Sequence, residues 1–206
     1  MRRTKYNDQG PARDLRSPII TPARMKKPPP GATFITEDRN RSQYLREVLA
    51  RLRNDVGTIF EAIEAHNRGS EQKIGFWAAL RLLLPIIEAV AHVMRKTPQE
   101  LIGDELGIPT PFLTWDLFRH SLIHGDLLQV GRYGAKEARW GVFLDGRDHK
   151  IEDGKVWIDA KTLYMDFESY LERESAQDDG TVASVEVGVN YVSNPRNGII
   201  EDFKKL

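Results

Sequence analysis

An uninterrupted series of apolar residues at helical spacing constrains the fold of this chain more than any other feature. Its members are Leu45, Val48, Leu49, Leu52, Val56, Ile59, Phe60 and Ile63. Because they recur three and four residues apart, they form one stripe along an α-helix. We predict this helix over residues 37–67, with Thr36 as its N-terminal cap. A helix of this length must bury its stripe, so the sequence predicts a helical bundle.

A second helix is predicted over residues 71–96, where apolar residues cover most of the circumference. That pattern indicates the central helix of the bundle. Pro85 lacks a backbone N–H and crowds the preceding turn, so we expect it to kink or split the helix. The uncharged runs within residues 76–94 are too short to span a bilayer. We interpret His92 as a hydrogen-bonded core or boundary residue rather than a catalytic one.

The composition excludes several classes of protein. The 206 residues suffice for one domain with a substantial core, and 40% apolar with 29% charged residues is ordinary for a soluble globular protein. The formal net charge is zero, so no global field steers the chain toward nucleic acid or a membrane. The chain has no Cys, which excludes disulfides, thiolate metal ligands and a Cys nucleophile. No export signal follows Arg2 and Arg3, and we expect a cytoplasmic protein.

Residues 1–34 are predicted to form a disordered, proline-rich arm. The arm contains eight Lys and Arg against two Asp, a net charge of +6. One interpretation is a solvated tail. The other is an electrostatic tether to RNA or another anion, whose effect weakens steeply with salt. The candidate RNA-binding residues of the tether are Arg2, Arg3, Lys26 and Lys27.

A capping box at Thr97 and Glu100, with Pro98 as the first helical residue, predicts a short helix over residues 98–105. The period of the apolar residues changes after Gly125. Segments rich in Val, Trp, Tyr and Leu, separated by turn sequences, occupy residues 127–133, 139–144 and 155–158. They predict two or three antiparallel strands. This small β insertion, at about 127–158, interrupts a helical domain that covers residues 35–175.

The last predicted helix follows its cap, Asp159, and extends to about residue 174. Its inward-facing residues are Leu163, Tyr164, Phe167, Tyr170 and Leu171. Residues 176–206 are predicted to be a linker and a C-terminal segment. Within that segment, residues 181–192 alternate imperfectly between Val and other residues, which is typical either of an edge strand or of a segment that orders only on a partner.

The segment of residues 115–126 concentrates side chains that can carry chemistry. Its apolar residues, at helical spacing, are Trp115, Phe118, Leu122 and Ile123. They predict an amphipathic helix that begins at Pro111 and ends before Gly125. The polar residues of the segment that can take part in chemistry are Asp116, Arg119, His120, His124 and Asp126.

Arg119 and His124 are separated by four residues, with His120 directly after the Arg and Gly125 directly after the second His. This arrangement resembles the motif of the HEPN family, and the resemblance covers about residues 37–174. HEPN proteins are small helical bundles, usually dimeric, and many are metal-independent ribonucleases that act as toxins or antiviral effectors. The resemblance implies a mainly α protein at the margin of the α+β class, an antiparallel HEPN-like bundle that works as a homodimeric endoribonuclease. By family analogy, an antitoxin or a nucleotidyltransferase is a candidate partner.

Cleavage of RNA by its own 2′-hydroxyl requires a proton acceptor, a cation for the phosphorane and a proton for the leaving oxygen. His124 titrates near neutral pH and is the candidate general acid or base. Arg119 offers a permanently charged planar fork to phosphate oxygens. His120 is a candidate orienting or second proton-handling group, with Asp116 and Asp126 in support. No cofactor is required, and the products carry 2′,3′-cyclic phosphates.

The spacing of Arg119 and His124 places a condition on this site. Five residues along a regular helix correspond to about 140° around its axis, so the two side chains do not project together. They converge if the helix loosens before Gly125, or if two copies of the motif face each other across a dimer axis. His120 and His124 share a face with Asp116, as zinc ligands do, but the Glu of the zinc-hydrolase motif is missing and we predict no metal.

Two other interpretations of the motif stay open. Arg119 and His124 can be a surface residue and a helix-terminal residue that stabilises the helix dipole. The fold can also serve as a non-catalytic module that binds RNA, a nucleotide or a protein through its long helices and its tails. A solvent-reached cleft at a two-fold interface that contains both residues favours the enzyme, whereas salt bridges within one subunit favour the alternatives.

Overall fold

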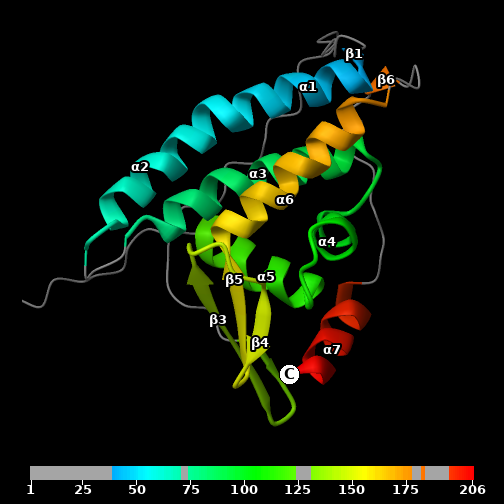
Figure 1. Cartoon of the computed structure of the whole chain (residues 1–206). Coiled ribbons are helices and arrows are strands. Elements are labelled where there is room, and N and C mark those ends of the chain that lie inside the picture. Colours follow the sequence, from blue (N-terminus) through cyan, green and yellow to red (C-terminus); the bar gives the residue numbers. More distant parts are fainter. Residues whose placement is uncertain (1–38, 71–73, 124–130, 178–181, 184–194) are drawn as a thin grey trace, which may run out of the picture. The chain divides into compact units, whose positions relative to one another are not determined.

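The computed structural model describes residues 39–70, 74–123, 131–177, 182–183 and 195–206, with only the backbone described for some of them, among these 119–123. The predicted N-terminal arm of residues 1–34 lies outside this set. The described residues form a mainly helical protein with one small four-stranded sheet, as Figure 1 shows. The sequence-based expectation of a mainly α chain with a small β part is therefore confirmed.

The long amphipathic helix is present as three consecutive segments. They are α1 (Arg41–Arg51), the π-helical segment η1 (Leu52–Gly57) and α2 (Thr58–Asn67). The predicted stripe is buried or partly buried along its whole length. The predicted start at residue 37 is wrong, because Arg39–Asn40 forms the short strand β1 and the Asn40 side chain caps α1 by accepting the Ser42 N–H at 2.8 Å.

Helix α3 (Phe76–Val93) provides the central layer of the core. It continues through Pro85, so the predicted split does not occur. Pro85 lies on the exposed side of α3, where the Arg81 carbonyl that loses its donor can bond to water instead. No single described helix is long and apolar enough to cross a membrane. Only when the helices Trp77–Val93 and Pro98–Glu105, which are bent relative to each other, are counted together are their length and apolar content sufficient.

The predicted short helix is present as α4 (Pro98–Glu100) followed by the π-helical segment η2 (Leu101–Glu105). Its capping box is confirmed, because the Thr97 N–H donates to Glu100 Oε2 at 2.6 Å and the Glu100 N–H donates to Thr97 Oγ1 at 3.1 Å. Helix α5 (Pro111–Ile123) begins where the sequence predicts. Its predicted end at Gly125 lies outside the described residues.

The four strands of the main sheet are β2 (Gly131–Tyr133), β3 (Lys136–Phe143), β4 (Lys150–Glu152) and β5 (Lys155–Asp159), in the order β2-β3-β5-β4. The expectation of a purely antiparallel piece is wrong, because β5 pairs with β3 in parallel. The hairpin between β4 and β5 explains the arrangement. It brings β5 back between β4 and β3, so that β5 runs in the direction of β3 (Figure 1).

Helix α6 (Ala160–Ser175) follows β5 directly, and its predicted cap, Asp159, is confirmed. Strand β6 (Val182–Ala183) pairs antiparallel with β1, which agrees in part with the predicted strand at residues 181–192; residues 184–192 lie outside the described set. The chain ends in α7 (Pro195–Lys205), a helix that the sequence analysis did not predict.

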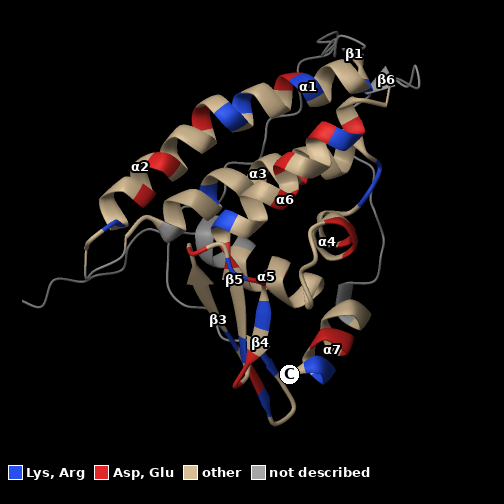
Figure 2. Cartoon of the chain, in the orientation of Figure 1, with Lys and Arg blue, Asp and Glu red and all other residues tan. Residues whose placement is uncertain are grey.

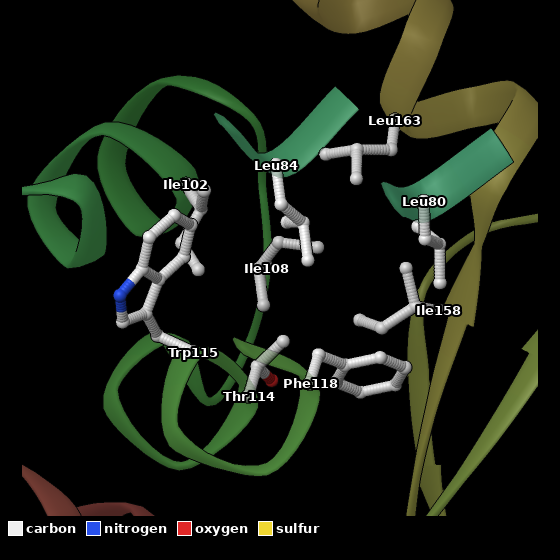
Figure 3. Close-up of a pocket in the computed structure, with 9 residues that line it drawn as sticks. All are labelled: Leu80, Leu84, Ile102, Ile108, Thr114, Trp115, Phe118, Ile158 and Leu163. Atoms are coloured by element: carbon white, nitrogen blue, oxygen red, sulfur yellow. The ribbon is translucent and has the colours of Figure 1, made fainter. Parts of the chain in front are cut away.

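The core lies where α3, α5 and α6 meet one face of the sheet. Figure 3 shows apolar side chains from these elements and from residues 101–108 converging on a small apolar cavity. Its lining residues are Leu80, Leu84, Ile102, Ile108, Thr114, Trp115, Phe118, Ile158 and Leu163. The residues of α5 in this group precede Arg119, so the packing of the core fixes the helix that carries the candidate motif.

Candidate functional site

The N-terminal end of α5 is held by a carboxylate from the other end of the chain. The Leu113 N–H, one of the donors that a helix leaves unpaired in its first turn, donates to Asp202 Oδ2 at 3.0 Å. Asp202 belongs to α7 and is only 2% exposed. Asp202 is 89 positions from Leu113 in the sequence. Helix α7 therefore functions as a remote cap of α5, the helix that carries the candidate motif.

Three further contacts fix α7 in place. Lys205 Nζ donates to Asp202 Oδ1 at 3.0 Å and to the Pro109 carbonyl at 2.8 Å, directly before α5. Lys136 Nζ donates to the Phe203 carbonyl at 3.0 Å, where a cation suits the negative end of a helix. Gly198 faces the Phe112 ring so closely that a Cβ at this position would lie 2.4 Å from it. Helix α7 therefore docks through specific groups at the start of α5.

The middle of α5 is anchored by its apolar face, as predicted. Trp115 and Phe118 are both buried. The Phe118 ring lies 5.8 Å from Trp140 of β3 and 6.5 Å from Trp77 of α3, and the two Trp rings meet edge to face at 4.1 Å. Asp116, on the opposite side of the helix, is exposed. The polar face of α5 thus opens outward at Asp116.

The structure places the predicted site residues only in part. Arg119 and His120 lie in α5, and the structure describes their backbone but not their side chains. His124 and Asp126 follow the last described residue of the helix. Because α5 is regular to Ile123, Asp116 and His120 lie one turn apart on one side of it. The proposed convergence of Arg119 and His124 remains a prediction, as does the role of the N-terminal cations.

A buried carboxylate, Asp159, organises the loop between β3 and β4. It accepts backbone N–H bonds at 2.9–3.2 Å from Asp145, Arg147, Lys161 and Thr162. The Asp159 N–H in turn donates to His149 Nδ1 at 3.1 Å. Burial lowers the pKa of His149, against the opposing effect of the Asp159 and Asp148 carboxylates. A neutral imidazole with its proton on Nε2 fits this arrangement.

Helix α7 and its buried Asp202 were not predicted from the sequence. A signal was present, since Ile199 and Phe203 are four residues apart and Pro195 is favoured at a helix start. Gly198 in the middle of the segment weakens that signal. The contact between Asp202 and Leu113 has no local signature at all, because it depends on how α7 packs.

Comparisons with known proteins add no relationship. No family model, no curated protein and no solved structure matches this chain. Within the described part of the chain, no group of three or more His, Asp or Glu side chains is placed to hold a metal ion.

Proposed function

We propose that this protein is a metal-independent endoribonuclease of HEPN type, of the defence or toxin class, with α5 as its catalytic helix. His124 acts as the general acid or base, Arg119 clamps the phosphate and stabilises the charge of the phosphorane, and His120 orients the reacting groups or handles the second proton. Asp116 and Asp126 support these groups. The products carry 2′,3′-cyclic phosphate ends.

The observation that carries this proposal is the anchoring of α5. Its start is fixed by Asp202 and its apolar face by the core, while the side with Asp116 is exposed. Catalytic groups have to be held within fractions of an ångström, and a helix with a buried face meets that need better than a loop does. Arg119 belongs to this helix, and His124 directly follows its last described residue in the sequence.

The angular separation of Arg119 and His124 makes a homodimer part of the proposal. The start of α3, near α5, offers a surface for a second copy, because Ile74 and Trp77 are 45% and 36% exposed although both are large and apolar. Exposed apolar side chains that lie close together commonly mark a protein interface. The Trp77 ring also contacts Phe118, the residue before Arg119. A partner at the start of α3 therefore lies near the motif.

The proposal is tested by incubating RNA with purified wild-type protein, Arg119→Ala and His124→Ala in excess EDTA. Arg51→Ala and His66→Ala are matched controls, since both residues are exposed and lie on the long helix away from α5. We expect wild type and controls to cleave, leaving cyclic phosphates. The two motif variants should lose about 100-fold or more in rate, the typical contribution of a positioned acid, base or oxyanion donor.

Two results would overturn the proposal. Equal cleavage by all five proteins means that the activity belongs to another site or to a contaminant. Absence of cleavage by the folded wild-type dimer, on structured and unstructured RNA alike, identifies the chain as a non-catalytic module that binds RNA, a nucleotide or a protein.

A further inference from the structure

The main sheet has one face turned toward the core and one turned away from it. Ala138, Val156 and Ile158 are buried against the helices. Side chains alternate along a strand, so the residues between them point outward. On this outer face the register places Gly141 beside Trp157 and Arg139 beside Lys155, with Phe143 at the end of β3. Aromatic and basic side chains therefore lie side by side on the outer face.

Phe143 and Trp157 form a stack on the outer face. Their ring centroids are 4.5 Å apart and the planes differ by 13°, close to parallel. Gly141 makes room for this stack, because a Cβ at position 141 would lie 2.2 Å from the Trp157 ring. The indole Nε1 of Trp157 is enclosed and has no hydrogen-bond acceptor. A shift of the ring that admits a ligand would hydrate this donor, which lowers the free-energy cost of opening the stack.

Cations cover both ends of the stack. The Arg147 guanidinium lies 5.4 Å from the centre of the Phe143 ring, and Lys150 Nζ lies 5.9 Å from it. Lys155 Nζ lies 5.4 Å from the centre of the Trp157 ring. Arg147 and Lys150 are well exposed, with 63% and 43% of their side-chain surface open to solvent. The order along the face is cation, Phe143, Trp157, cation.

Carboxylates on the same face keep its net charge small. Asp145 pairs with Arg147 at 3.0 Å and Glu152 pairs with Lys150 at 2.8 Å. Figure 2 shows basic and acidic residues interleaved on the strands of the sheet. Long-range attraction alone cannot therefore define a ligand for this face. The ligand is better defined by two local interactions. These are stacking on the planar side chains and contact with one or two ammonium groups.

We propose that the outer face of the sheet binds single-stranded RNA, and that this stack is the contact surface. In one arrangement a nucleotide base stacks on the exposed guanidinium of Arg147. In the other the base stacks on the Trp157 indole and displaces Lys155. The displaced ammonium then contacts a phosphate. Bases of a single strand have free faces for such stacking, whereas those of a duplex are already stacked on one another. This inference rests on the proposed ribonuclease function for its choice of RNA.

The stack and the motif helix lie on opposite faces of the sheet, because Trp140 on the inner face of β3 contacts Phe118. The RNA-binding surface is thus a second site, separate from the reacting groups. Its residues position RNA and do not take part in bond cleavage. Changes in the stack should affect binding, and changes at Arg119 or His124 should affect cleavage.

The test measures the fluorescence anisotropy of a labelled single-stranded RNA of about 12 nucleotides, titrated with the full-length protein; its 2′-hydroxyls are methylated so that the proposed ribonuclease cannot cleave it. The variants are Phe143→Leu and Lys155→Gln, with Arg132→Gln as the control, which removes one charge from the same sheet away from the stack. We expect each stack variant to raise Kd about 10-fold and the control to leave it within about 2-fold. Thermal melts establish that the variants are folded.

Two comparisons separate this inference from the proposed function. The exposed variants Arg51→Ala and His66→Ala should bind RNA with the wild-type Kd, and a duplex of the same sequence should bind about 10-fold more weakly. If wild type cleaves RNA but the stack variants bind it normally, this inference is wrong and the ribonuclease stands. If the stack variants lose binding and no protein cleaves, the binding site stands and the ribonuclease falls. Equal binding of duplex and single strand also contradicts the stack.

Discussion

Helices α5 and α6 are both held at their N-termini by a buried aspartate, but the two aspartates come from different places. Asp159 directly precedes α6 and accepts the N–H groups of Lys161 and Thr162 at 2.9 Å. Asp202 comes from α7 and accepts the Leu113 N–H of α5 at 3.0 Å. The start of α6 is thus fixed by its own sequence. The start of α5, the candidate catalytic helix, depends on a helix that docks from the C-terminus.

The largest expected effect comes from Asp159→Ala. The substitution removes the acceptor of four backbone N–H groups, and each buried donor left unpaired costs about 1–3 kcal/mol, with about 1 kcal/mol for the cap. Because some donors regain water, we expect the free energy of unfolding to fall by about 3–5 kcal/mol. Urea denaturation measures this change. Asp145→Ala keeps its own N–H bond to Asp159 and should lose less than about 0.5 kcal/mol. Similar losses in both variants would show that Asp159 does not organise the loop.

Asp202→Ala should have the next largest effect. It leaves the Leu113 N–H and the Lys205 ammonium without their buried partner, which we expect to lower the free energy of unfolding by about 2–3 kcal/mol. Amide hydrogen exchange should accelerate in α7 and at the start of α5, while α6 stays protected. Glu201→Ala removes an exposed neighbouring carboxylate and serves as the control. Unchanged exchange at Leu113 in Asp202→Ala would contradict the remote cap.

The smallest expected effect concerns pH and the loop at Asp159. Burial holds the pKa of His149 below its ordinary value of 6.5, so the unfolded chain binds a proton that the folded chain does not. The contribution of neutral His149 is complete above pH about 6.5 and is lost as the pH falls through that value toward the folded-state pKa. Between pH 7 and 5, wild type should lose more stability than His149→Gln in urea denaturation. Parallel losses in the two proteins would show that neutral His149 does not stabilise the fold.

The elements that the sequence predicts share a local cause. The stripe on α1 and α2 follows from apolar residues three and four positions apart. The capping box involves two residues three positions apart, Thr97 and Glu100, and α6 starts at its cap, Asp159. Each involves groups within one or two turns of each other, whose interactions do not depend on the rest of the fold. Helix α5 begins at Pro111 for the same reason.

The elements that the sequence analysis missed depend on distant contacts. The parallel pairing of β3 and β5 follows from where the hairpin of β4 and β5 docks, and turn sequences do not encode this. Helix α7 gains its stability from Asp202 and Phe203 packed against other elements. For the candidate site, the sequence predicts the helix and its exposed side at Asp116. The proposed convergence of Arg119 with His124 requires either a loosened helix end or a second copy of the chain, and the sequence does not decide between them.

The central claim is that α5 carries one half of a ribonuclease site that two subunits complete. The most direct measurement mixes Arg119→Ala and His124→Ala subunits after mild dissociation and follows RNA cleavage in EDTA. A composite site leaves one intact Arg–His pair in each mixed dimer, so the account predicts recovery to about a quarter of the wild-type rate. A mixture as inactive as either variant alone, with mixed dimers present, would contradict the shared site.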